Sequence, residues 1–308
     1  MICGSDSVGQ KVMATIGMFD GVHLGHQWLI ADLKARAASL GLGTAIITFR
    51  DHPHNVLRPG KRLKMLMSAS RRLECLRATG VGRVIDMDFT PELSMLGSAE
   101  FMGLISRRYG VAALLVGYNH RFGHNRDERF AQYQANGARL GVRVEQAAEY
   151  AGPEAPVSSS IVRDLVERGE VAAAAAKMGS PLRLAGRVVH GYARGRDLGF
   201  PTANIEVDPA LILPRCGAYA VMVETPDGQR LCGMANIGTR PTFSGCESSV
   251  EVNIFGFSGD VYGRMIAVDF VERLRDERPM ASAEELRAQL LADRLAAARL
   301  LDAASKGR

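Results

Sequence analysis

The chain changes character at Gly179-Ser180-Pro181, and this change constrains its fold more than any other feature. Before it, short runs typical of strands alternate with helical runs. The strand-like runs are Val12 to Ile16, Thr44 to Phe49, Arg83 to Phe89, Ala112 to Val116 and Val142 to Ala147, and the helical runs are Gln27 to Leu40, Ser70 to Thr79, Ala99 to Tyr109 and Phe130 to Leu140. This alternation predicts an α/β fold with a mostly parallel sheet, helices on both faces and ligands at the carboxyl ends of the strands.

After the break, almost every run is typical of a strand. These runs are Leu182 to Val189, Tyr219 to Glu224, Arg230 to Ile237, Val250 to Phe255 and Ile266 to Val271. Thr225-Pro226-Asp227-Gly228 predicts a hairpin turn, and the pattern as a whole predicts a small antiparallel β-barrel. A final helix is expected from Ser282, where Glu285 completes a capping box. The residues expected to be buried against the barrel are Leu286, Leu290, Leu291 and Leu295.

Length and apolar content agree with two domains. A chain of 308 residues exceeds the usual size of one domain, and 47% apolar residues are enough to fill two cores. We therefore expect one domain over residues 1–180 and a second over residues 181–308.

Composition narrows the class of protein. A net charge of +5 and a pI near 9.1 suit a polyanionic ligand or a nucleic acid, but the basic residues are dispersed, which favours a nucleotide over a nucleic acid. No apolar run approaches the roughly 18 residues of a membrane span, and the first 15 residues lack a signal-peptide core. We expect a cytoplasmic protein whose five widely spaced cysteines are reduced. The sequence does not predict an oligomeric state.

Two imidazoles lie where the first strand-like run gives way to the first helix. His23-Leu24-Gly25-His26 follows Gly17, which ends the strand. Free backbone N–H groups and the positive end of the helix dipole favour an anion there, and glycines let the backbone approach a phosphate closely. Two imidazoles at that place would stabilise charge that develops on a phosphoryl group. Alone, the motif is also compatible with an ordinary turn whose histidines lie at the surface or in the core.

Three further stretches of the first part have suitable chemistry. Ser158-Ser159-Ser160 precedes a helix and can cap it while binding phosphate, and Arg163 can clamp phosphate oxygens; an ordinary serine cap explains the serines equally well. Gly117 to Gly123 follows the carboxyl end of a strand, and His52-Pro53 follows another. On their own, these residues are compatible with a surface loop histidine at 120 and with a hydrogen-bonded loop histidine at 52.

The β-rich part carries a glycine-rich arc that ends in Pro201-Thr202-Ala203-Asn204. Gly191, Gly195 and Gly199 would let backbone amides wrap phosphates, and the oxygens of Thr202 and Asn204 are hard ligands suited to Mg²⁺. The alternative is a simple turn between two strands. The chain has no Gly-x-x-x-x-Gly-Lys-Ser/Thr, so a P-loop is excluded.

The first part resembles the nucleotidyltransferase superfamily and, in its wording, the bacterial FAD synthetases. The similar stretches are Gly17 to His26, Thr48-Phe49 with His52-Pro53, Gly117 to Gly123 and Ser158 to Arg163. The resemblance implies a Rossmann-like domain that joins FMN to AMP from ATP, with His23 and His26 catalytic. It implies ATP or phosphate binding by Gly17, Phe19, Asp20, Gly25, Asn119, Ser159, Ser160 and Arg163, and flavin binding by His52 and Pro53. His120 departs from the family, which has Phe there.

The second part resembles the riboflavin kinases closely, through Gly195 to Asn204. The resemblance implies Mg-ATP-dependent phosphorylation of riboflavin. It implies Glu251 as the base, Gly195, Gly199, Thr202 and Asn204 as phosphate-binding residues, Thr202 and Asn204 as Mg²⁺ ligands, and Arg275 with Glu277 next to the flavin. Without the resemblance, Glu251 and the Arg275–Glu277 stretch would be solvent-facing residues of a strand and a turn.

The resemblance spans Val12 to about Arg299, so the main prediction is a bifunctional riboflavin kinase and FAD synthetase that binds riboflavin, FMN and ATP. Two alternatives remain open at this point. One is a kinase with a degenerate adenylylating half, which the departure at His120 keeps open. The other is a flavin- or RNA-binding regulator that has the fold without turnover.

Overall fold

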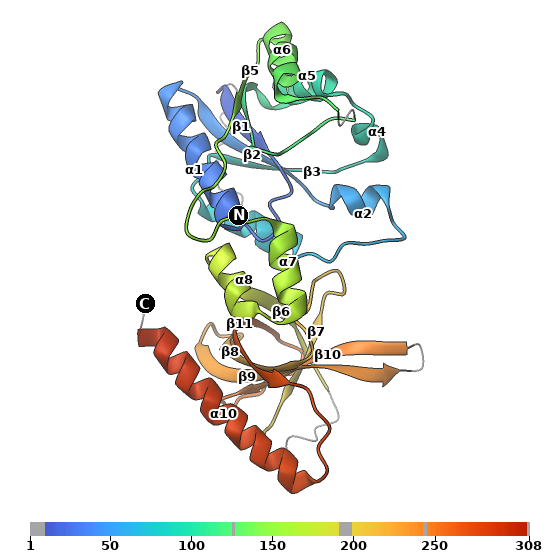
Figure 1. Ribbon diagram of the computed structural model, residues 1–308, viewed down its shortest axis with the longest axis vertical. Coiled ribbons are helices and arrows are strands. Elements are labelled where there is room, and N and C mark those ends of the chain that lie inside the picture. The colour runs from blue at the N-terminus through green and yellow to red at the C-terminus, as the bar shows by residue number, and fades with distance from the viewer. Residues whose placement is uncertain (1–9, 125–126, 191–198, 243–244, 307–308) are drawn as a thin grey trace. The chain divides into compact units, whose positions relative to one another are not determined.

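The computed structural model describes residues 10–124, 127–190, 199–242 and 245–306, without the side chains of 240–248 and 304–306. Contacts divide the chain into two compact units (Figure 1). The first is Met1–Leu63 with Ser68–Ser158, and the second is Lys64–Met67 with Ser159–Arg308. The chain therefore passes three times from one unit to the other. Residues 159–180 pack with the barrel, whereas the functional boundary at residue 180 stays a prediction, because this division describes contacts alone.

The first unit is built on a parallel sheet of five strands, as expected. The strands are β1 (Val12–Ile16), β2 (Gly43–Phe49), β3 (Arg83–Met87), β4 (Val111–Val116) and β5 (Arg143–Gln146). Their order is β3-β2-β1-β4-β5, so the chain reverses its winding between β1 and β4. Every residue of β1 is buried, because helices cover both faces of the sheet. The carboxyl ends of β1 and β4 flank the place where such folds bind ligands.

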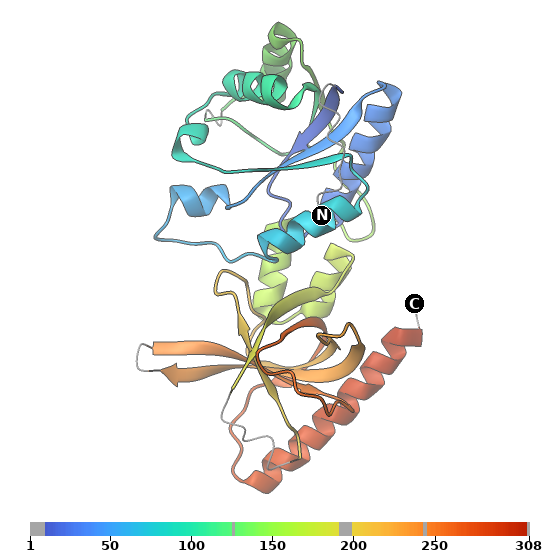
Figure 2. The same ribbon diagram turned by 180° about the vertical axis from the view of Figure 1, so that it is seen from behind.

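Helices cover the two faces of this sheet (Figures 1 and 2). The described helices of this unit are α1 (Leu24–Ser39), α2 (Pro53–Leu57), α3 (Ala69–Ala78), α4 (Pro91–Ser94), α5 (Ser98–Tyr109) and α6 (Phe130–Leu140), of which α1, α3, α5 and α6 pack on strands of the sheet. One core cluster joins α5 and α6 to alternate residues of the central strands, among them Val12, Ala14 and Ile16. The other face of the sheet receives α1, whose Ile30, Leu33 and Ala37 are buried.

The second unit is a closed antiparallel barrel, which confirms the expected class. Its strands are β6 (Leu182–Val189), β7 (Ala203–Val207), β8 (Gly217–Glu224), β9 (Arg230–Thr242), β10 (Gly245–Ile254) and β11 (Met265–Asp276), in the order β10-β7-β6-β11-β8-β9. The sequence did not predict β7, because its first residues lie within the Pro-Thr-Ala-Asn motif. The expected hairpin turn joins β8 to β9, where the Gly228 amide donates to the Thr225 carbonyl.

In the described part of the second unit, helices and one short segment pack with the barrel. α7 (Ser159–Arg168) leads into α8 (Val171–Met178), which packs on β11, and α10 (Ala283–Lys306) packs on β8 and β9 (Figure 2). The segment Lys64–Met67 also belongs to this unit. The amide of Met65 donates to the Ala210 carbonyl (2.8 Å), and the amide of Ile212 donates to the Met65 carbonyl (2.9 Å).

The face that α10 turns to the barrel differs from the prediction. Leu291 and Leu295 are 48% and 60% exposed, so the expectation that they are buried was wrong. The buried stripe instead continues from Leu290 through Asp293 and Ala297 to Leu301. A buried aspartate takes a position that hydrophobicity alone would give to a leucine, because Asp293 is paired with an arginine of β11.

Candidate active sites

The two histidines of the first unit form a stacked pair at the start of α1. Their ring centroids are 3.6 Å apart and their planes are 18° from parallel. His23 caps the helix, since its Nδ1 accepts a hydrogen bond from the His26 amide (3.3 Å). If the His23 imidazole is neutral, its proton is on Nε2, so Nε2 is the nitrogen that can donate a hydrogen bond.

His26 is held neutral. Burial lowers the pKa of His26 well below its ordinary value, and the neighbouring His23 and His120 lower it further. Its Nδ1 is buried and has no hydrogen-bond partner among the described residues. Phe19 packs against the His26 ring, with centroids 5.0 Å apart. The pair thus presents two stacked imidazoles, of which His26 is neutral, at the positive end of a helix, where a phosphoryl group would be stabilised.

The turn before the pair is strained and closely packed. Phe19 and Val22 have positive φ angles of 53° and 40°, which non-glycine residues rarely adopt. A β-carbon at Gly25 would lie 3.3 Å from the His23 ring, and one at Gly17 would lie 3.2 Å from the Phe19 ring. Asp20 is 1% exposed in this turn. The glycines at 17 and 25 therefore make room for the side chains that shape the site.

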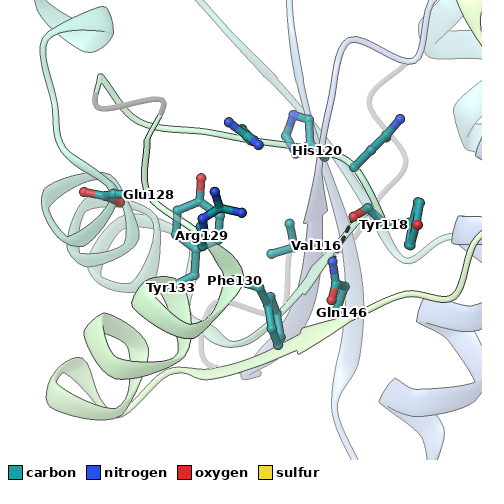
Figure 3. A pocket seen from close by; sticks show the side chains of 10 residues that line it. Val116, Tyr118, His120, Glu128, Arg129, Phe130, Tyr133 and Gln146 are labelled. Carbon is teal, nitrogen blue, oxygen red and sulfur yellow. Dashed lines mark hydrogen bonds between the residues drawn. The ribbon is translucent and has the colours of Figure 1, made fainter.

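A pocket of about 230 Å³ lies beyond the carboxyl end of β4 (Figure 3). Its lining combines aromatic side chains, two arginines and polar groups: Val116, Tyr118, Asn119, His120, Arg121, Glu128, Arg129, Phe130, Tyr133 and Gln146. The Gln146 amide donates to the Tyr118 carbonyl (2.8 Å) and fixes the loop. Burial lowers the pKa of His120 to about 4, so this imidazole is neutral near pH 7. Flat and cationic groups together suit a nucleotide.

His52 and Pro53 follow the carboxyl end of β2 and begin α2. The Nδ1 of His52 accepts a hydrogen bond from the His54 amide (3.1 Å), so His52 caps this short helix as His23 caps α1. Pro53 takes the first helical position, which suits its fixed φ. Thr48 is fully buried, and its hydroxyl donates to the Met18 carbonyl (3.2 Å), which joins this region to the turn before α1.

Ser159, Ser160 and Arg163 start α7, which belongs to the second compact unit. Arg163 is 8% exposed, and its Nε donates to the Lys64 carbonyl (3.0 Å). The sequence grouped these residues with the histidine pair. Their phosphate-binding role stays a prediction.

In the barrel, register brings several predicted residues into one row. Glu251 of β10 lies directly opposite Asn204 of β7 and Asn236 of β9. Asn236 in turn lies opposite Ala218 of β8, which lies opposite Arg275 of β11. Directly opposite residues share a face of the sheet at Cβ separations of about 4.5–5.5 Å. Asn236 is the member of this row that sequence reasoning missed, since only strand pairing reveals it.

Thr202 lines a second pocket, of about 350 Å³, at the start of β7. The pocket also contains Ala203 and its opposite neighbour Val252, which come directly before Asn204 and directly after Glu251 in their strands. The side-chain amide of Asn253 donates to the Pro201 carbonyl (2.7 Å) and holds the chain beside Thr202. Gly199 has a φ of 83°. Gly195 lies outside the described residues.

Arg275 is engaged within the barrel unit. Its guanidinium pairs with both carboxylate oxygens of Asp293 on α10 at 2.8–3.0 Å, and its Nη1 donates to the Asp276 carbonyl (2.9 Å). Glu277 lies next to β9, where a β-carbon at Gly238 would be only 2.8 Å from its carboxylate. Arg275 thus anchors the end of β11 to α10, and Glu277 extends toward the row that contains Asn236.

Comparison with known proteins separates the same two parts. A FAD synthetase model matches residues 5–161, and a riboflavin kinase model matches residues 178–301. The bifunctional riboflavin kinase/FMN adenylyltransferase of Pseudomonas fluorescens is 38% identical over 96% of this chain and 94% of its own length. The protein of the same name from Escherichia coli K12 is 34% identical over 95% and 94%. This chain belongs to that family.

A solved structure also shares the fold of the family. A crystal structure named a macrolide-efflux protein from Streptococcus pneumoniae has 31% sequence identity and a TM-score of 0.84, and covers 93% of both chains. No helix within the described ranges is long and apolar enough to cross a membrane.

The two family matches agree with the two sites. The FAD synthetase match contains the stacked pair of His23 and His26, and the riboflavin kinase match contains Thr202 and the row through Glu251. The residues between the matches, 162–177, form most of α7 and α8. Both halves of the family are therefore present in this chain, which favours the bifunctional prediction over the single-activity alternative.

Proposed function

We propose that this chain phosphorylates riboflavin to FMN with ATP and then joins FMN to AMP from a second ATP, with release of pyrophosphate. The observation that carries the proposal is the stacked pair of His23 and His26 at the start of α1, in a chain that also has the kinase barrel. A regulator that only binds flavin would need neither this pair nor Glu251 beside Asn204.

In the adenylylating half, an oxygen of the FMN phosphate attacks the α-phosphorus of ATP, and the bond to the bridging oxygen of pyrophosphate breaks. The FMN phosphate is already ionised, so the step needs no base. The Nε2–H of His23 and the ring of His26 stabilise the charge that develops at phosphorus. Asp20, Gly17, Phe19 and Gly25 shape this turn, the pocket with Asn119 takes the nucleotide, and His52 with Pro53 contacts the flavin. Ser159, Ser160 and Arg163 hold the leaving pyrophosphate.

In the kinase half, the oxygen of the ribityl 5′-hydroxyl attacks the γ-phosphorus of ATP, and ADP leaves. Glu251 takes the proton of that hydroxyl during the attack. The pocket at Thr202 takes the nucleotide, with Gly195 and Gly199 along its phosphates. Arg275 anchors the stretch that carries Glu277 toward the flavin.

A hard divalent cation fits the donors present. The described residues contain no group of three His, Cys, Asp or Glu side chains that could hold a metal ion, but the oxygens of Thr202 and Asn204 suit an ion that takes its other ligands from phosphate and water. Mg²⁺ bound there would neutralise charge on the transferring phosphoryl group. Because both reactions consume ATP, we propose that they take place in the cytoplasm. We assign the adenylylation of FMN to a domain over residues 1–180 and the phosphorylation of riboflavin to a domain over residues 181–308.

The test uses the full chain. Purified protein is incubated with riboflavin and Mg-ATP, and riboflavin, FMN and FAD are separated by chromatography over time. We expect FMN to appear first and FAD to follow, and we expect FAD directly when FMN replaces riboflavin. FMN without FAD would indicate a kinase alone, and no turnover of either substrate would contradict the proposal.

A further inference from the structure

One arginine of the first unit, Arg72, is completely buried, although it belongs to none of the stretches that resemble the FAD synthetases. Arg72 lies on α3, and its side chain, 1% exposed, is among the largest fully buried ones. Its Nε is also buried and has no hydrogen-bond partner among the described residues. A buried cation is a poor source of stability, since an apolar residue of similar shape often stabilises as well. Arg72 therefore calls for an explanation other than packing.

The guanidinium of Arg72 holds the end of β2. Its Nη2 donates to the Phe49 carbonyl (2.5 Å) and to the Arg50 carbonyl (3.3 Å). These two carbonyls come directly before the turn that presents His52 and Pro53 at the start of α2. A single charged group thus sets the direction in which the chain leaves the sheet at this point.

The same guanidinium is coupled to the turn before α1. Burial lowers the pKa of Arg72, and the carboxylates of Asp20, Asp86 and Asp51 oppose that shift. Asp20 is 1% exposed and lies between Phe19 and Gly21, in the turn that leads to the histidine pair. A buried carboxylate is stabilised by a nearby positive charge, and Arg72 is one such charge. A hydrogen bond also joins the two turns, since the hydroxyl of Thr48, the residue before Phe49, donates to the Met18 carbonyl (3.2 Å).

We propose that Arg72 is a positioning residue for FMN adenylylation, which holds the turn with His52 and Pro53 in register with the turn that carries Asp20. It contacts neither substrate. Its hydrogen bonds fix the flavin side, and its charge stabilises the nucleotide side. The inference rests on the proposed function, because it assigns those two turns to FMN and ATP.

The test separates charge from geometry with two variants of the full chain. Arg72→Lys keeps the charge near Asp20, but one ammonium cannot reproduce the guanidinium's bonds to two carbonyls. We expect the KM for FMN to rise about tenfold, which is the scale of one lost charge-assisted hydrogen bond. The KM for ATP should change less than about twofold, because the charge near Asp20 is kept. Arg72→Met loses both contributions. For this variant we expect both KM values to rise and kcat for FAD to fall about 10²-fold, as small misplacements of reactants do.

Arg71 is the matched control. It precedes Arg72 on α3, is exposed, and pairs with Glu74 one turn away (3.2 Å). Arg71→Lys and Arg71→Met should leave all constants unchanged. FMN formation from riboflavin is a second control, since its site lies in the barrel, and the fluorescence of Trp28, the one tryptophan of the chain, reports thermal unfolding of the first unit.

Three results would overturn the inference: constants near those of the parent in both Arg72 variants, equal changes in the two KM values in Arg72→Lys, or a lower melting temperature of Arg72→Lys without a change in KM. If Arg72→Met does not fold, Arg72→Lys alone decides. If the parent makes no FAD, the proposed function fails, and calorimetric binding of FMN and of ATP to the parent and Arg72→Lys decides on Arg72 separately.

Discussion

A barrel fragment that starts before α7 should be more stable than one that starts after α8. The two fragments are residues 159–308, which follow the contact division of the chain, and residues 181–308, which follow the change in composition. They differ in α7 and α8. On α8, the side chains of Val171 and Ala174 are fully buried and Met178 is 2% exposed, and the helix packs on β11 and β6.

The size of the effect follows from this burial. Full burial of a valine or methionine side chain stabilises by about 1.5–3 kcal/mol each, so loss of Val171 and Met178 costs about 3–6 kcal/mol. Domains are typically stable by about 5–15 kcal/mol, so the shorter fragment keeps only part of its stability. With a urea m value of about 2 kcal/mol/M, its midpoint should be lower by about 1.5–3 M.

The assay is urea unfolding followed by circular dichroism, with FMN formation measured in parallel. Both fragments contain Thr202, Asn204 and Glu251, so each should make FMN while folded, and the shorter should lose activity at lower urea. In the longer fragment, Met178→Ala should cost about 2–5 kcal/mol, whereas Ala176→Ser on the exposed side of α8 should cost less than about 0.5 kcal/mol. Coinciding midpoints of the two fragments would refute the reasoning, because α8 would then not belong to the barrel core.

Three further outcomes test the sites. His26→Ala should lower FAD formation from FMN about 10²-fold or more and leave FMN formation near normal; equal loss of both in a chromatographic assay would indicate misfolding. Glu251→Gln should slow phosphorylation of riboflavin about 10²–10⁴-fold but still convert supplied FMN to FAD, and a normal kinase rate would place the base elsewhere. His120 has a pKa of about 4 in the folded chain, below its value of about 6.5 when unfolded, so it costs stability as the pH falls through that window, by about 2 kcal/mol at pH 5. His120→Phe should therefore reduce the loss of stability between pH 7 and pH 5, measured by Trp28 fluorescence in urea, and an unchanged acid sensitivity would contradict this.

Much of the fold could be predicted because both kinds of strand leave a pattern: strands of the parallel sheet read as apolar runs, and strands of the antiparallel barrel alternate between buried and more exposed residues. β1 (Val12–Ile16) and β6 (Leu182–Val189) begin and end as predicted, and α6 does too. β7 was not predicted, because its first residues belong to a motif that is also typical of a turn. On α10, apolarity alone gave no reason to prefer Ala297 over Leu295, since the choice depends on which stripe faces β8 and β9.

The sites could be predicted only as residues, not as arrangements. The spacing of His23 and His26 predicted two imidazoles at a helix start, but the stacking of the rings and the nitrogen that accepts the helix N–H depend on the strained turn at Phe19 and Val22. Asn236 became visible only through strand register, which pairs residues from distant parts of the chain. Arg72 has no local signal, because the carbonyls that it binds are more than 20 residues away in sequence.

The three passages of the chain between its compact units limit how such a protein can exchange parts with its relatives. A single genetic crossover near residue 159 would transfer the barrel without Lys64–Met67. The backbone groups of Ala210 and Ile212, which now bond to Met65, would then face whatever segment the new partner supplied. Chimeras made at that junction should therefore fold better when the new first half has a matching segment at 64–67 than when its sequence there is foreign. This short stretch would then be inherited together with the barrel rather than with the sheet domain that surrounds it in sequence.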